Sequence, residues 1–383
     1  MDYLVYRFLS LSARAGCDAS HLQRLSKETV HLESQLPEWD GVADQAEAQG
    51  IAPLLYTHLR EAGIQPPPPV RRALQGLYLH HRDANQLKTR VLKELLTTFD
   101  AAGVPVLVLK GGALSHLVYP EPGLRPMGDL DLFVAKTYVR QAHDLLVKKG
   151  FILPFSSSSP REELLHGHLP AASVSIDGVV VKVEIHHNLF RAYESHSMEM
   201  GDLSSLPLPF RLGPDGITAR TLGYEDMLRH LCLHFCNIYH SPSLLGTLRL
   251  IWVADIISFS EHFARVIDWE KLEVQSPFVV STLSLLHFLT PLSEDLITQA
   301  PIKIERKPEG VGESYRGWPT SALPKHGIKD FGRFLKDTFF PSEWWLRLYY
   351  GLDTIQPLFW YRLLHHPLHI LGNVKHRNLI GRG

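Results

Sequence analysis

The sequence predicts an α+β protein in which a small mixed β-sheet core is flanked by N- and C-terminal helical regions. Two short apolar runs bounded by turn residues, "VPVLVL" at 104–109 and "DLDLFV" at 129–134, have the composition of strands. The segment 171–190 carries Asp177-Gly178 between two β-branched runs, which predicts a hairpin. On both sides of this core, apolar residues recur at spacings of three and four, which indicates helices.

These patterns divide the chain into five regions: residues 1–100 helical, 101–215 the α/β core, 216–300 helical, 301–330 a loop, and 331–383 a helical region rich in aromatic residues. Within the first region, the run "IQPPPPV" at 64–70 predicts a stiff extended connection, because four prolines cannot continue a helix. Aromatic residues of the last region are expected to pack between helices; these are Trp344, Trp345, Tyr349, Tyr350, Phe359, Trp360 and Tyr361.

Composition restricts the partners and the compartment. The 383 residues include 39 Lys and Arg against 40 Asp and Glu, so no global field attracts nucleic acid or an anionic membrane. A long nucleic acid partner is therefore disfavoured. Three cysteines are too few for a disulfide framework, which favours a reducing compartment, and we expect the cytoplasm. No apolar run is long enough to predict a membrane span.

Asp129 and Asp131 are the first candidates for chemistry. Two residues apart on a strand, they point to the same face and lie roughly 6.6–6.8 Å apart along the chain. Leu130 and Leu132 point to the other face and can pack on the core. Parallel carboxylates repel unless a cation lies between them, and hard divalent cations accept such oxygen ligands. The pair therefore predicts a metal site.

A third acid strengthens this prediction. In "VVVKVEIHH" at 179–187, strand alternation places Lys182, Glu184 and His186 on one face and the valines on the other. Glu184 would complete a site of three acids, able to hold two magnesium ions about 3.5–4 Å apart. His186 is expected to orient Glu184 or to contact substrate as an accessory residue.

Gly111 and Gly112 predict a phosphate site beside these acids. A glycine pair between a strand and a helix lets backbone amides approach phosphate oxygens without a Cβ in the way. Lys110 and Arg125 add positive charge, and the guanidinium of Arg125 suits bidentate phosphate contact. The alternative role for Arg125 is structural, an ion pair with Asp129 or Asp131 that braces the loop.

Taken together, these residues resemble a known family, the uncharacterised nucleotidyltransferases of the DNA polymerase β-like superfamily. The resemblance is carried by Leu109-Lys110-Gly111, by Arg125 followed by Gly128-Asp129-Leu130-Asp131-Leu132, and by Glu184-Ile185-His186. Similar helical segments extend it over most of residues 30–365. It implies a polymerase β-like core and metal-assisted, nucleotide-dependent transfer, with Asp129, Asp131 and Glu184 as metal ligands.

The resulting expectation is transfer of a nucleoside monophosphate from a nucleoside triphosphate (NTP), ATP among them, to a hydroxyl-type acceptor, with release of pyrophosphate. Two Mg²⁺ ions are the expected cofactors, with Mn²⁺ as the alternative. The acceptor stays open among a small molecule, a sugar, a peptide and a protein. The alternative function is a catalytically degenerate core that acts as a binding module in a larger assembly and keeps its fold without turnover.

Other enzyme classes and other sites are weaker interpretations. Haloacid dehalogenase phosphatases and nucleotide-sugar glycosyltransferases place Asp-x-Asp after an apolar strand, whereas here the apolar residues follow it. A zinc site at His230, His234, Cys232 and Cys236 is disfavoured, because the two pairs lie on different faces of a helix. Asp255, within an apolar helical stretch, is expected to pair with an arginine such as Arg249 or Arg229.

Overall fold

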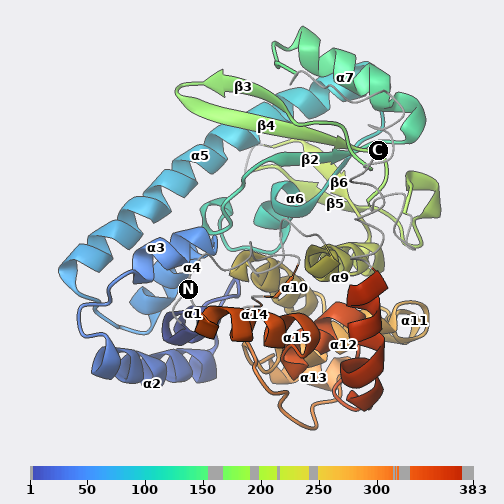
Figure 1. Ribbon diagram of the computed structural model, residues 1–383. Coiled ribbons are helices and arrows are strands. Elements are labelled where there is room, and N and C mark those ends of the chain that lie inside the picture. Colours follow the sequence, from blue (N-terminus) through green and yellow to red (C-terminus); the bar gives the residue numbers. More distant parts are fainter. Residues whose placement is uncertain are drawn as a thin grey trace.

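The computed structural model describes residues 3–153, 167–189, 198–213, 216–240, 249–313, 315, 317–318 and 328–372, with side chains left out at 236–240 and 328–330. A small β-sheet with its adjoining helices lies on one side of the molecule, and a larger helical body lies on the other (Figure 1). This arrangement is the α+β architecture that the sequence predicts.

The sheet has four strands in the order β1-β2-β4-β3. They are β1 (Leu107–Val108), β2 (Leu130–Phe133), β3 (Ala172–Ile176) and β4 (Val179–His186). The central strands β2 and β4 are parallel, and the outer pairs are antiparallel, so the sheet is mixed as expected. A separate antiparallel pair, β5 (Leu208–Arg211) and β6 (Thr218–Thr221), was not predicted.

The turn between β3 and β4 confirms the predicted hairpin. Asp177 and Gly178 have φ values of +50° and +78°, the left-handed conformation that a two-residue hairpin turn requires at both central positions. Pairing continues from Ile176↔Val179 to Ala172↔Val183. Because this turn is so short, it sets the register that later places Glu184.

The N-terminal helices are α1 (Tyr3–Ser10), α2 (Ala19–Gln35), α3 (Val42–Ala48), α4 (Ala52–Glu61) and α5 (Pro68–Ala101). The extended connection expected at 64–70 is only partly correct, since α5 begins at Pro68 inside the proline run. Proline is tolerated in the first helical turn, because the amide it lacks has no helical partner there. Pro67, in contrast, is extended, with φ −47° and ψ 141°.

The long helix α5 connects two hydrophobic cores. Its early Leu74 belongs to the core of the helical body, whereas Leu92 and Phe99 belong to the core behind the sheet. Shorter elements complete the sheet region; these are α6 (Lys110–Leu117), α7 (Val139–Lys148) and the 3-10 turns η1 (Pro122–Leu124), η2 (Lys136–Tyr138) and η3 (Met200–Asp202). The strands are thus anchored on one face by apolar packing.

The helical body continues with α9 (Tyr224–His240), α10 (Leu250–His262), α11 (Trp269–Gln275), α12 (Pro277–Leu286), α13 (Glu294–Gln299), α14 (Ile328–Phe339), α15 (Glu343–Tyr350) and a π-helical turn η4 (Tyr361–His365). In the region 301–330, predicted as a loop, residues 301–313 contain no helix or strand, and α14 begins at Ile328. Residues 319–327 and 373–383 lie outside the described residues.

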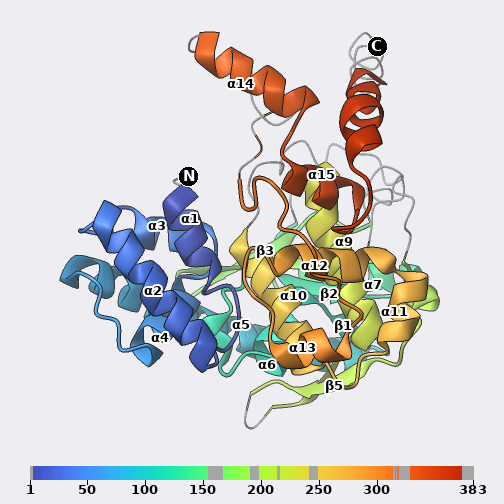
Figure 2. The ribbon, with the colours of Figure 1, turned by 90° about the horizontal axis from the view of Figure 1, so that it is seen from below.

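The C-terminal aromatic residues divide into two groups. Trp344 and Trp345 are buried in α15, and Trp345 stacks on Tyr349 at a centroid distance of 4.5 Å. The packing expected for the whole stripe is wrong for Phe359 and Trp360, which are 61% and 62% exposed. Figure 2 shows α14 and the last helical segment projecting from the body. In the part of the chain that the structure describes, no helix is long and apolar enough to cross a bilayer.

Candidate active site

Strands β2 and β4 bring two of the predicted acids together. The strands run parallel, and their register places Asp131 opposite Glu184. Leu130 and Leu132 on β2 and Ile185 on β4 alternate with the acids and are buried in the apolar core. Because successive strand residues point to opposite faces, both carboxylates project from the face of the sheet away from that core.

Asp131, Glu184 and His186 form a compact group, in which one ligand atom from each residue lies within 4.8 Å of the others. His186 Nε2 is 2.7 Å from Asp131 Oδ1 and 3.5 Å from Glu184 Oε2. Lys110 Nζ donates to the same Asp131 oxygen at 3.0 Å. Two carboxylates, an imidazole and an ammonium therefore share one site.

Asp129 lies beside this group without being a member of it. It precedes β2 by one residue and belongs to the loop that leads into the strand. The charge of Asp131, followed by burial, raises the pKa of Asp129, so its carboxylate is close enough to feel the group. Two neighbouring acids resist full ionisation unless a cation is added.

The other pKa values are set by opposition between burial and pairing. Burial disfavours the charge of Asp131, but Lys110 and His186 outweigh it and hold the pKa of Asp131 well below its usual range. In the same way, burial is outweighed by the carboxylates that raise the pKa of Lys110 and of His186. For Glu184, the contact with His186 overcomes burial and lowers the pKa. The group is thus a network of mutually stabilised charges.

Lys110 reaches Asp131 from an unusual backbone conformation. Its φ of +43° lies in the left-handed region, which costs a non-glycine residue about 1–3 kcal/mol. Lys110 is also the first residue of α6, directly after β1 and Leu109. Strain of this kind persists only where surrounding contacts enforce it, and here it places the ammonium on the acidic group.

Gly111 and Gly112 lie in the first turn of α6. A Cβ on Gly111 would lie 2.3 Å from Arg125 Nη1, and one on Gly112 would lie 2.9 Å from Val108 Cγ1. Both glycines are therefore required for close packing. Amides in the first turn of a helix have no intrahelical acceptor and are free to bind an anion. The phosphate contacts predicted for this turn stay a prediction.

Arg125 has a structural partner. Its Nε and Nη2 donate to Asp255 Oδ1 and Oδ2 at 3.1 and 2.6 Å, and its Nη1 donates to the Pro126 carbonyl at 2.8 Å. Tyr119 donates to Asp255 Oδ1 at 2.8 Å. Asp255 thus pairs with an arginine as expected, but the expected partners were wrong. The phosphate contact predicted for Arg125 stays a prediction.

The arginines that were expected to pair with Asp255 lie elsewhere. Arg229 pairs with Asp226 at 3.4 Å. The guanidinium of Arg249 lies over the ring of Trp252, with its central carbon 5.9 Å from the ring centroid. Each arginine is thus engaged with a neighbour in or next to its own helix.

Two residues of α5 that the sequence reasoning missed support the loop before Asp129. The buried side chain of Asn85 donates to the carbonyls of Pro122 and Arg125 at 2.7 and 2.8 Å and accepts from the Met127 amide at 3.3 Å. Lys88 donates to the Met127 carbonyl. The sequence did contain a signal for this role, because Asn85 and Lys88 are polar residues three apart on the apolar, buried face of the helix.

His168 is a further neighbour that the sequence did not indicate. It forms an isolated bridge with His186, its ring centroid lies 5.1 Å from that of His186, and its Nδ1 lies 3.8 Å from Glu184 Oε2. The disfavoured zinc site gains no support. Within the described residues, no group of three close ligands contains His230 or His234, and the side chain of Cys236 lies outside them.

The donor set fits a divalent cation. Carboxylate oxygens suit Mg²⁺ and Mn²⁺, and a neighbouring imidazole is compatible with Mn²⁺ and other transition metals. Asp131 and Glu184 converge within reach of one ion, and the raised pKa of Asp129 shows that positive charge is in short supply beside them. These residues are the ones that would hold a metal.

Comparisons with known proteins indicate what the chain is similar to. One solved structure that the chain matches is that of an antigenic nucleotidyltransferase-like protein from Paracoccidioides brasiliensis, with 15% identity, a TM-score of 0.34, and coverage of 55% of this chain and 96% of that one. No curated protein matches. The family model described as "Uncharacterised nucleotidyltransferase" matches residues 35–282, well over half of the 383 residues, and the chain therefore belongs to that family.

Proposed function

We propose that the protein transfers a nucleoside monophosphate from an NTP to a hydroxyl-type acceptor. The acceptor oxygen forms a bond to the α-phosphorus, and the bond from that phosphorus to the oxygen bridging to the β-phosphorus breaks. Pyrophosphate leaves with the bonding electrons, and the hydroxyl proton passes to solvent. The observation that supports this reaction best is the register that sets Asp131 against Glu184 on adjacent parallel strands.

In this proposal, Asp129, Asp131 and Glu184 bind two Mg²⁺ ions, with Mn²⁺ as the alternative. Bound cations would neutralise the phosphates and make the attacking hydroxyl more acidic. Glu184 has the most exposed side chain of the close group, 22% against 3% for Asp131. It is therefore the acid best placed to meet an acceptor that enters from solvent.

The phosphate groups of the donor would lie against the start of α6. Lys110 already carries its ammonium into the site, and the first-turn amides of Gly111 and Gly112 follow it directly. Arg125 would act mainly from behind this turn, because its guanidinium lies against Gly111 and is held by Asp255. His186 would position Asp131 and Glu184 through its short contacts with both.

The test is incorporation of label from α-³²P NTPs in the presence of Mg²⁺ and a cell extract, with the product identified by mass. Asp131→Asn keeps the shape of the side chain but removes the charge, and we expect it to abolish labelling. The matched control is Asp177→Asn, the same change at an exposed hairpin turn of the same sheet. This control should label as well as the wild type.

Equal labelling by wild type and Asp131→Asn would overturn the proposal. Binding of NTP by an intact wild-type fold, without labelling of any acceptor, would favour the alternative of a degenerate binding module. The experiment also identifies the acceptor class among a small molecule, a sugar, a peptide and a protein.

A further inference from the structure

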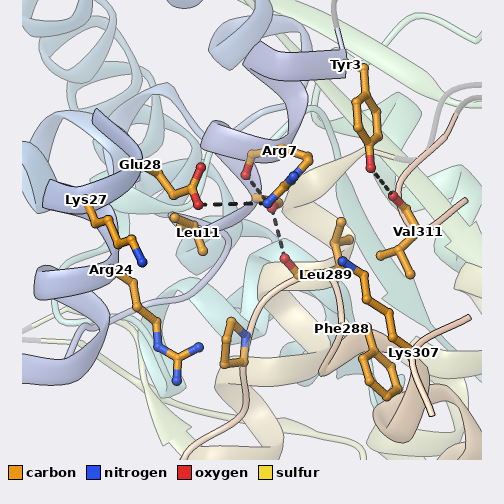
Figure 3. Close-up of a pocket in the computed structure, with 12 residues that line it drawn as sticks. Tyr3, Arg7, Leu11, Arg24, Lys27, Glu28, Phe288, Leu289, Lys307 and Val311 are labelled. Atoms are coloured by element: carbon orange, nitrogen blue, oxygen red, sulfur yellow. Dashed lines mark hydrogen bonds and ion pairs between the residues drawn. The ribbon is translucent and has the colours of Figure 1, made fainter. Parts of the chain in front are cut away.

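A hollow on the helical body, far along the chain from the acidic group, has the features of a ligand site. Its cavity volume is about 360 Å³, within the range of small-molecule sites. Figure 3 shows side chains from α1 and α2 facing side chains of the segments around 288–291 and 307–311. The lining residues are Tyr3, Arg7, Ser10, Leu11, Arg24, Lys27, Glu28, Phe288, Leu289, Pro291, Lys307 and Val311.

The charge of this hollow is strongly one-sided. Its lining includes four cationic side chains and the single carboxylate of Glu28, which pairs with Arg7 at 3.8 Å. Within the described residues, no carboxylate lies within ion-pair distance of Arg24, Lys27 or Lys307. Three cations are therefore left facing the hollow without an anion.

This arrangement favours an anionic ligand. Arg24 and Lys27 are three residues apart on α2, so they lie on the same face and repel each other. Lys307 adds a third charge from a segment about 280 positions further along the chain. An anion with several oxygens would relieve this repulsion and bind all three side chains.

The wall opposite α2 is held in place by buried side chains. The hydroxyl of Ser10, 2% exposed, donates to the Leu289 carbonyl at 3.0 Å. Arg14, 1% exposed, donates to the Pro291 carbonyl at 2.6 Å, and His21 contacts the same oxygen at 2.9 Å. The hollow is therefore a preformed feature of the fold, which lowers the entropic cost of binding.

The lining also has an apolar part, to which Leu11, Phe288, Leu289 and Val311 contribute. A site that combines convergent cations with aromatic and aliphatic surface suits a ligand with a charged end and an uncharged body. Guanidinium and ammonium groups together are the usual partners of phosphate oxygens.

We propose that this hollow binds a small molecule that carries a diphosphate or comparable phosphate group. The phosphates lie among Arg24, Lys27 and Lys307, and the remainder lies against Phe288 and Leu11. The site shares no residue with the acidic group, so the inference is independent of the proposed transfer reaction.

The test is calorimetric titration of the full chain with pyrophosphate in EDTA, at 50 and 200 mM salt. We expect metal-independent binding near one per chain that weakens with salt, as a charge-driven interaction should. Lys27→Glu and Lys307→Glu should each weaken binding by about ten-fold or more, on the scale of a lost charge-assisted contact. Both side chains are exposed, so the fold should remain intact by circular dichroism.

A control separates this site from nonspecific attraction. Lys149→Glu reverses an exposed charge on the sheet region and should leave binding unchanged. Absence of binding by the wild type, unchanged binding by Lys27→Glu and Lys307→Glu, or equal weakening by Lys149→Glu would each overturn the proposal. ADP in place of pyrophosphate tests the apolar part, and tighter binding of ADP would support its contribution.

Discussion

The Arg125–Asp255 pair and the acidic group around Asp131 are both buried, yet their charges are balanced differently. In the pair, one guanidinium meets one carboxylate through two contacts, and the hydroxyl of Tyr119 adds a third donor. In the acidic group, the carboxylates of Asp131 and Glu184 are paired with Lys110 and His186, and the carboxylate of Asp129 lies beside them. The charges of the Arg125–Asp255 pair balance, whereas the acids around Asp131 carry more negative charge than their cationic neighbours neutralise.

This difference distinguishes a cluster that suits a structural role from one that suits ligand binding. A buried pair with every oxygen bonded stabilises the fold as long as both members remain. A cluster with surplus charge of one sign retains mutual repulsion, seen in the raised pKa of Asp129, and is suited to a ligand of the opposite sign. Substitutions in the two clusters should therefore affect different properties.

The largest effect on stability is expected for Asp255→Asn. Removing this carboxylate leaves the buried guanidinium of Arg125 without its partner, which typically costs about 3–5 kcal/mol of unfolding free energy. Urea unfolding followed by circular dichroism measures it. The control is Asp295→Asn, which breaks the exposed pair with Arg265 and should not change the midpoint measurably. Equal midpoints for both variants would show that the pair does not brace the fold.

Glu184→Gln should show the opposite pattern. If Glu184 binds a catalytic cation, the variant loses about 10²–10³-fold in transfer rate, the usual cost of removing one group that stabilises transition-state charge. Its unfolding free energy should change by less than about 1 kcal/mol, because the side chain is partly exposed and the lost contact with His186 is offset by relief of burial of the charge and of repulsion from Asp131. A large loss of stability with unchanged rate would reverse the assignment of the two clusters.

Gly111→Ala tests the contact between the clusters. The new Cβ would lie 2.3 Å from Arg125 Nη1, and Asp255 prevents the guanidinium from moving freely. Overpacking costs about 1–3 kcal/mol, and the better helix propensity of alanine returns up to about 1 kcal/mol of that. Gly128→Ala is the matched control, since its Cβ would meet nothing within 4 Å. Unfolding of both variants in urea should separate them, and equal stability would mean that Arg125 moves readily.

Local patterns in the sequence were sufficient to predict those parts of the site that depend on strand alternation. The alternation around Asp131 and Glu184 predicts which face each acid occupies, and the Asp177-Gly178 turn predicts the hairpin that carries Glu184. That these two strands are adjacent and parallel does not follow from alternation alone. The register of β2 and β4 shows it, and it was not among the predictions.

Contacts between distant segments could not be predicted in the same way. Arg125 and Asp255 are 130 residues apart, and several arginines were equally plausible partners on sequence grounds. The contribution of Asn85 depends on how α5 crosses the loop at 122–127, which no periodicity describes. The exposed side chains of Phe359 and Trp360 show the same limit, because an apolar residue is consistent with packing whether or not a neighbour covers it.

An effect that depends on pH is expected for His58, a buried group with cations, not acids, for neighbours. Burial, together with the charges of Arg14 and His21, lowers the pKa of His58 from 6.5 to about 4. Between these values the unfolded chain binds more protons than the folded one, so stability falls as pH decreases from 6.5 toward 4. The loss from His58 is about 1 kcal/mol over the first pH unit and levels off below pH 4.

His58→Leu should therefore make the unfolding free energy less dependent on pH between 6.5 and 4.5, as measured by urea unfolding at several pH values. Some dependence will remain, because burial also lowers the pKa of other histidines to about 4; these are His116, His187 and His366. The exposed His31 provides the control, and His31→Leu should leave the slope unchanged. An unchanged slope in His58→Leu would mean that this imidazole is protonated inside the fold. Burial without an opposite charge would then not suffice to keep a group neutral in this protein.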